Sequence, residues 1–173
     1  GYYNISSLGL ALGSREYSGL SVSPGIYTLN GCKFNKHLMA GVGVGLEWLN
    51  ESGKMPIFLD ARYRILQGNV SPFVGVMAGY NVSLQGKENR QYYDIWYDPG
   101  RHDKGGVTAG IQFGFLANVG EHIGLTGSAG YRYQHLTTSY NDYWWNNGEY
   151  NILPVIERTD MHRVTLSFGL LFE

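Results

Sequence analysis

The sequence has little of what identifies several common classes of protein. Its 173 residues include a single cysteine, Cys32, so no disulfide can form within the chain, and we expect this thiol to be inert, in or near a turn. The formal net charge is −1 and Lys and Arg form no run, so nothing indicates a nucleic acid partner. No stretch approaches the ~18 consecutive apolar residues of a transmembrane helix. These absences argue against a disulfide-stapled domain, a nucleic-acid-binding protein and a helical membrane protein.

Motifs for metal and cofactor chemistry are also missing. The five histidines lack the spacing of a motif such as His-Glu-x-x-His, so the sequence predicts no metal site. The glycine-rich segment GVGVG at 41–45 falls inside a predicted strand, where alternate glycines relieve crowding, and so does not fit a phosphate-binding loop. We therefore expect neither a cofactor nor a bound metal ion.

What the chain does contain is a strict alternation of residue types, clearest over residues 38–48, LMAGVGVGLEW. Successive side chains of a strand point to opposite faces. One face of this strand is apolar: Leu38, Ala40, Val42, Val44, Leu46 and Trp48. The other face is nearly empty and then charged: Met39, Gly41, Gly43, Gly45 and Glu47. A face with almost no side chains suits the crowded inside of a narrow closed barrel, which leaves the apolar face for lipid.

The same alternation returns in five further segments, 57–66, 74–82, 107–115, 123–134 and 163–172. In each, apolar or aromatic residues occupy one face and Gly, Ser, Thr, Gln or ions the other. Each holds roughly the ten residues that a tilted strand needs to cross a bilayer. This two-residue period is the signature of a transmembrane β-barrel. Girdles of aromatic residues at both interfaces are expected from Trp48, Tyr63, Tyr80, Tyr131, Tyr133 and Phe172.

The chain length fits one domain, residues 1–173, built as an all-β, eight-stranded antiparallel up-and-down barrel. We place the strands near 3–13, 18–31, 37–49, 56–67, 70–83, 105–117, 122–136 and 159–172. A bulge is expected at Pro24-Gly25, because the apolar positions change face there, from Leu20 and Val22 to Tyr27 and Leu29. The longest connections fall at 84–104 and 137–158. Bacterial barrels have short periplasmic turns and long external loops, which places both termini in the periplasm.

The chain resembles the small eight-stranded outer-membrane β-barrel family of Gram-negative bacteria, in particular the barrel proteins common in Bacteroidetes. The resemblance is carried by FNKHLMAGVGVGLEWL at 34–49, PIFLDARYRILQGNVSPFVGVMAGY at 56–80, IGLTGSAGYRYQ at 123–134 and RVTLSFGLLF at 163–172. It implies export with removal of a signal peptide and insertion by the barrel-assembly machinery, which reads an aromatic C-terminal strand. Here Phe172 is followed by Glu173, not by the chain end.

Eight strands enclose a space just wide enough for side chains, so we expect a closed lumen filled by polar side chains. The inward positions carry six ions that are costly to bury unless paired: Glu47, Asp60, Arg62, Arg64, Arg132 and Arg163. Gln112 and Gln134 join them. We interpret this set as an ion-pair network that plugs the barrel, with a gated ion path as the alternative.

Any specific activity must lie in the long connections, which are rich in Tyr and Trp among Asn, Asp and Gly. Rigid amphipathic rings of this kind suit recognition surfaces. The candidate ligand-binding residues are Tyr92, Tyr93, Trp96, Tyr97, Tyr143, Trp144 and Trp145. The alternative is purely structural, with paired aromatic residues stiffening hairpins above the membrane and Asn146-Asn147-Gly148 at one tip.

The preferred function is therefore non-enzymatic, in envelope integrity or in surface recognition and adhesion. The expected partners are membrane lipid, the barrel-assembly machinery, and a surface glycan or host protein. The first alternative is an outer-membrane enzyme that acts on lipid or peptide at the external rim, with a site drawn from His102, His135, Ser139, Asp142 and Asp160. The second is a soluble lipocalin-like barrel with its apolar face turned inward around a ligand.

Overall fold

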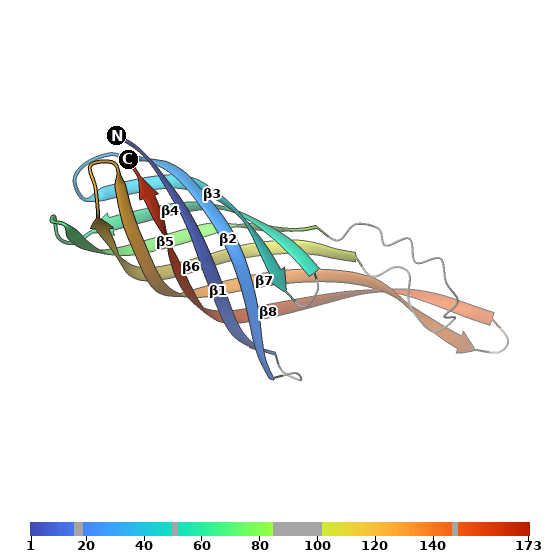
Figure 1. Cartoon of the computed structure of the whole chain (residues 1–173). Helices are drawn as coiled ribbons and strands as arrows, with labels where there is room; N and C mark the ends of the chain where they lie inside the picture. Colours follow the sequence, from blue (N-terminus) through green and yellow to red (C-terminus); the bar gives the residue numbers. More distant parts are fainter. Residues whose placement is uncertain (16–18, 50–51, 85–101, 147–148) are drawn as a thin grey trace.

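The computed structural model describes residues 1–15, 19–49, 52–84, 102–146 and 149–173 of the chain. These residues form eight antiparallel strands that close into one barrel in sequence order (Figure 1). The strands are β1 Tyr2–Arg15, β2 Gly19–Lys33, β3 Leu38–Leu49, β4 Ser52–Arg64, β5 Val70–Ser83, β6 His102–Asn118, β7 Ile123–Asn146 and β8 Glu149–Phe172. The predicted fold class is confirmed, and the described residues include no helix able to span a membrane.

Both termini lie at one end of the barrel, which we call the termini end (Figure 1). The connections 34–37, 65–69 and 119–122 share that end, and we call the opposite end of the barrel the loop end. If the cross-strand partners are followed from Tyr2 of β1 through each strand to β8, the path returns to β1 at Leu12, ten residues further along the chain. Strand number and this stagger together fix the tilt and the width. The result is a narrow barrel, and side chains fill its interior.

The outer wall is apolar. Val42, Ile111 and Leu166 lie in the middle of three strands and are 54%, 49% and 45% exposed. Their alternate neighbours point inward, and the inward Glu47 is only 1% exposed. The predicted assignment of faces is confirmed. A lipocalin-like arrangement would place these apolar side chains in the central cavity, so the structure contradicts that alternative.

The bulge predicted at Pro24-Gly25 is absent, which corrects the sequence prediction. The β1–β2 register runs without a shift from Tyr2↔Cys32 to Arg15↔Gly19. Tyr27 and Leu29 point into the lumen because part of the lumen is itself apolar. The register shift in the described strands instead lies in β6 between Asp103 and Gly105. Gly105 has φ +80°, a left-handed conformation that favours glycine.

Strands β7 and β8 extend well beyond the predicted bounds of 122–136 and 159–172. Their backbones stay paired from Leu136↔Thr159 out to Asn146↔Glu149. The predicted loop 137–158 is thus mostly an extended two-stranded ribbon that projects past the rest of the barrel (Figure 1). The alternation of residue types stops before the ribbon begins because neither of its faces has to match a lipid or a core environment. The alternation in the sequence therefore predicted only those parts of β7 and β8 that belong to the barrel wall.

The lumen is arranged in layers along the barrel axis. Near the termini end, an apolar cluster is built from Tyr3, Ile5, Leu29, Met39, Phe58, Phe73, Leu116 and Leu171, with Tyr27 and Met77 packed against it. Toward the loop end lie the buried ions Glu47, Arg132 and Arg163. Beyond them a second apolar cluster joins Leu49, Leu136 and Met161. The predicted polar filling therefore occupies only part of the lumen.

Candidate functional site

The Glu47 carboxylate is the centre of the buried ions Glu47, Arg132 and Arg163 in the lumen. Its Oε1 accepts a hydrogen bond from Tyr27 Oη at 2.6 Å and another from Arg132 Nη1. Arg163 Nη1 lies 3.9 Å from Oε2. All three ions are buried, so each would be costly to hold in this place without an opposite charge beside it. The carboxylate thus links side chains of four strands, β2, β3, β7 and β8, across the lumen.

Asp60 forms a second buried centre nearer the termini end. Arg62 Nε donates to Oδ1 at 2.7 Å, and Gln112 Nε2 donates to Oδ2 at 2.5 Å. The Arg62 guanidinium also lies over the Phe73 ring, 4.9 Å from its centroid. Arg64 occupies the same face of β4, half-buried, and donates to Ser71 Oγ at 2.7 Å. The six ions predicted from sequence thus face the lumen, where five of them belong to two separate centres and Arg64 donates to Ser71.

A third polar cluster lies on the outer surface of β7 and β8, at the loop end of the apolar band. His135 and Asp160 are direct partners across the ladder, and His135 Nδ1 lies 2.6 Å from Asp160 Oδ1. Tyr133 Oη donates to the same oxygen at 2.7 Å. Next to them, Tyr131 Oη is hydrogen-bonded to His162 Nδ1, and their rings stack with centroids 6.0 Å apart. We call these five residues the rim cluster.

The two partners of Asp160 set its protonation. The hydrogen bonds from Tyr133 and then His135 hold the pKa of this carboxyl below its usual range. A lowered carboxyl pKa favours the ionised form, so the contact persists as pH falls through the ordinary carboxyl range and is lost only in stronger acid. Asp160 is therefore a fixed negative charge that orients the His135 imidazole.

Not every residue of the predicted enzyme site joins this cluster. The backbone of Asp142 pairs with Leu153, seven positions beyond His135 along β7. Ser139 pairs with Ile156 on β8 and with His102 on β6. His135 and Asp160 are thus brought together by strand register, and no local motif announced the pair.

The predicted recognition residues fall into two groups. Tyr92, Tyr93, Trp96 and Tyr97 lie outside the described residues. Tyr143, Trp144 and Trp145 belong to the outer part of the β7–β8 ribbon, where their backbones pair with Ile152, Asn151 and Tyr150. The ribbon therefore carries this aromatic segment away from the barrel wall. Within the described ranges, no three His, Cys, Asp or Glu side chains gather as a metal site would require.

The aromatic residues predicted to form girdles lie near both ends of the outer apolar wall. Trp48, Tyr80 and Tyr131 are exposed toward the loop end, and Tyr63 and Phe172 toward the termini end. Tyr133, half-buried, belongs to the rim cluster. Tyr80 Oη also donates to the Lys104 carbonyl at 3.1 Å. Such rings prefer the lipid headgroup zone.

Sequence reasoning missed one group of outward polar residues on β1 and β2. Asn4, Ser6, Thr28 and Asn30 form a hydrogen-bonded patch in a wall that is otherwise apolar at this level. The available signal was the weak alternation of β1, where Asn4 and Ser6 occupy positions that Leu8 and Leu10 occupy further along.

Comparison with solved structures identifies the fold. The crystal structure of neisserial surface protein A matches with a TM-score of 0.61 and 18% identity, covering 99% of this chain and 96% of that one. The outer membrane protein OprG of Pseudomonas aeruginosa matches with a TM-score of 0.60 and 10% identity, covering 99% and 95%. The outer membrane protein AlkL, solved in lipid bilayers, matches with a TM-score of 0.61 and 13% identity, covering 99% of this chain and 88% of that one.

These similarities show that the chain has the fold of eight-stranded outer-membrane barrels. No protein-family model matches the chain, and no curated protein matches its sequence. The Bacteroidetes-type family suggested by the sequence is therefore not shown by any of these comparisons.

Proposed function

We propose that this protein is an integral outer-membrane barrel with a closed lumen that presents the β7–β8 ribbon for recognition at the cell surface. The observation that carries the proposal is the ribbon itself, which continues past the apolar wall from Leu136↔Thr159 to Asn146↔Glu149. The lumen beneath it is filled by the Glu47 and Asp60 centres and two apolar clusters. An ordered projection above a filled barrel suits binding better than transport.

The orientation follows from the same features. We place the termini end in the periplasm and the loop end outside, as short periplasmic turns and long external segments are the rule for bacterial barrels. The ribbon then reaches a surface glycan or a host protein. The apolar wall contacts membrane lipid, and insertion depends on the barrel-assembly machinery.

Membrane residence is tested by moving one substitution along the outer surface. Ile111→Arg places a charge midway along the apolar wall and is expected to cost about 2–4 kcal/mol of folding free energy in liposomes. Ile156→Arg is the matched control, because Ile156 is exposed on the ribbon beyond that wall. Urea titration of both variants in liposomes measures the difference. Equal stabilities would contradict burial of the wall in lipid.

Recognition is tested on the whole folded protein in nanodiscs. A glycan array and a panel of extracellular-matrix proteins supply the ligands, and the Trp144→Ala/Trp145→Ala variant is compared with Trp48→Ala. Trp48 is an exposed tryptophan of the outer wall, so its loss controls for a general effect of removing an indole. We expect at least a tenfold loss of binding for the ribbon variant alone. Binding that is absent from the wild type, or equal in all three proteins, would contradict the proposal and leave envelope integrity as the role.

A second candidate function rests on the His135–Asp160 contact. Asp160 holds Nδ1 of the imidazole, and Nε2 makes no hydrogen bond to the described residues, so it is available to take a proton from water. Water so activated would attack an ester carbonyl of a lipid at the rim and release a fatty acid and an alcohol. The candidate is thus a lipid hydrolase of the outer leaflet.

The hydrolase is tested by measuring fatty acid release from vesicles of outer-membrane lipid. His135→Gln is expected to lower the rate at least a hundredfold, as loss of a general base does. His122→Gln, in the turn at the opposite end, controls for histidine replacement as such. Wild-type protein that releases no fatty acid eliminates this candidate without touching the recognition proposal.

A further inference from the structure

The outer wall carries one polar area where every neighbouring wall position is apolar. We call Asn4, Ser6, Thr28 and Asn30 the outer polar patch. Across the ladders, Asn4 and Ser6 lie beside Phe172 and Leu170 of β8, and Asn30 and Thr28 beside Val42 and Val44 of β3. These four apolar side chains are all exposed on the outer wall. The patch therefore begins level with Phe172 at the termini-end edge of the apolar wall and extends from there into that wall.

The patch satisfies part of its own hydrogen bonding. Asn4 Nδ2 donates to Thr28 Oγ1 at 3.1 Å and to Asn30 Oδ1 at 2.9 Å, and Ser6 Oγ donates to Asn4 Oδ1 at 3.1 Å. Tyr2 Oη also donates to Asn30 Oδ1, at 2.6 Å. The Asn30 Nδ2 group and the Thr28 hydroxyl proton donate to none of the residues the structure describes. Donors left without acceptors are costly in hydrocarbon, so a partner that accepts from them is favoured.

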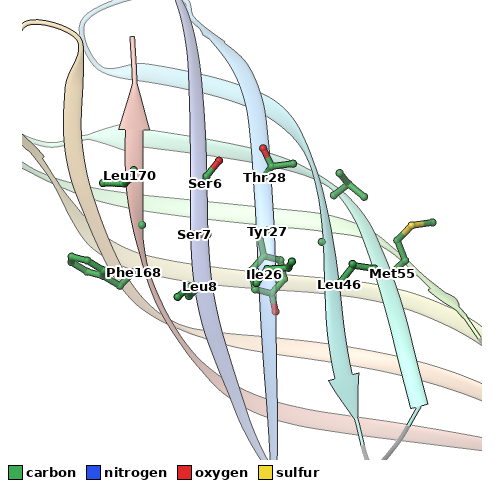
Figure 2. A pocket seen from close by; sticks show the side chains of 13 residues that line it. Ser6, Ser7, Leu8, Ile26, Tyr27, Thr28, Leu46, Met55, Phe168 and Leu170 are labelled. Carbon is green, nitrogen blue, oxygen red and sulfur yellow. The ribbon is translucent and has the colours of Figure 1, made fainter.

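A hollow opens beside the patch on the same outer surface (Figure 2). Its volume is about 750 Å³, and it runs across β8, β1, β2 and β3 to Met55 of β4. Ser6 and Thr28 line it together with the larger Ile26, Leu46 and Leu170. Leu8 and Phe168 stand at its side and are 67% and 57% exposed. The wall thus offers a depression and protruding apolar side chains next to each other.

Cys32 lies on the same side of β2, two positions beyond Asn30. It is a free, exposed thiol and pairs with Tyr2 across the ladder. An unpaired cysteine in an exported protein suggests an intermolecular contact or a reactive thiol. Its position at the termini-end edge of the outer polar patch makes it a natural reporter of whatever covers that surface.

We propose that the β1–β2 wall is an interface between two copies of this chain, an inference that rests on the proposed membrane residence. A two-fold contact brings the same patch of both copies together. Carboxamides and hydroxyls are each donor and acceptor, so the Asn30 amide and Thr28 hydroxyl of one copy find acceptors in the other. Leu8 and Phe168 of one copy then fill the hollow of its partner. A lipid acyl chain fills the hollow equally well but accepts no hydrogen bond from the patch.

The test measures the oligomeric state of the full chain in lipid bilayers, by single-molecule photobleaching and by crosslinking through Cys32 with a short bis-maleimide. We expect a dimer and a Cys32 crosslink in the wild type. The Thr28→Val/Asn30→Leu variant makes the patch resemble its Val44 and Val42 neighbours, and it is expected to dimerise at least tenfold more weakly. Val76→Leu, which alters an exposed apolar position of β5 away from the patch, leaves dimerisation unchanged.

Two controls keep the outcomes separate. Cys32→Ser/Val76→Cys moves the thiol to the opposite wall and should give no crosslink. Liposome co-sedimentation of every variant verifies membrane residence, so failure of the proposed location is seen independently of dimer loss. A monomeric wild type, with or without bound lipid, would overturn the interface. So would equal crosslinking from both cysteine positions, or unchanged dimerisation of the Thr28→Val/Asn30→Leu variant.

Discussion

Glu47→Gln is expected to destabilise the barrel by about 3–5 kcal/mol, because the change removes the carboxylate charge that pairs with buried Arg132 and lies beside buried Arg163. Arg132 and Arg163 both approach this carboxylate, and all three side chains are buried in the lumen. Glutamine keeps the size of the side chain, so the loss reports the charge and not a cavity. Urea unfolding in liposomes, followed by tryptophan fluorescence, measures the effect.

The control for this result removes the unpaired cation as well. Glu47→Gln/Arg132→Met replaces both partners, and buried ion pairs exchanged for apolar side chains are often close to neutral in stability. The double variant should therefore recover most of the loss, even though Arg163 remains. A Glu47→Gln barrel as stable as the wild type would show that water already screens this layer. Planar-bilayer recordings of the wild type should then show the stable conductance that a filled lumen excludes.

Phe58→Ala is the second change with a large expected effect, about 3–5 kcal/mol of destabilisation from lost burial and the cavity left behind. The ring lies in the apolar cluster of the lumen and meets Tyr27 edge to face, with centroids 6.4 Å apart. It also covers the inner face of Gly43 on the neighbouring strand β3. The ring thus occupies the space that Gly43 leaves empty.

The ring and the glycine are expected to be coupled, which a double-mutant cycle detects. A Cβ at Gly43 would overlap the Phe58 ring, so Gly43→Val alone is expected to cost about 1–3 kcal/mol through overpacking. In the Phe58→Ala background the valine instead fills part of the cavity, so the double variant should be more stable than Phe58→Ala alone. Simple addition of the two losses would contradict the packing of ring on glycine.

The alternation that is clearest over residues 38–48 was enough to predict the barrel. It could not predict which of the inward or rim side chains contact one another. Glu47 and Arg132 were both predicted to face the lumen, but their pairing joins positions 85 residues apart. His135 and Asp160 were both named as rim residues, and only the β7–β8 register showed them as direct partners. The outer polar patch was visible only as imperfect alternation in β1.

The errors have the same origin. Tyr27 and Leu29 suggested a bulge at Pro24-Gly25 because an apolar side chain in a barrel was expected to face lipid. The structure shows an apolar cluster inside the termini end, where such side chains are equally well buried. The predicted strands stopped at 136 and 159 because a two-residue alternation reports a contrast between two faces, whereas the alternative of a hairpin above the membrane agrees with the pairing out to Asn146↔Glu149. Where both faces of a strand lie in the same environment, its sequence shows no such alternation.

By itself the sequence determined that strands alternate between a lipid-facing and an inward-facing side, and from this the closed barrel with its apolar outer wall. That information is local, because the direction of each side chain follows from its place in its own strand. Only the tertiary structure decided which inward ions pair, which side chains fill each layer of the lumen, and which residues of β1 and β2 form a polar patch. These contacts depend on the register of all eight strands and on the ten-residue stagger at closure, which no single segment contains.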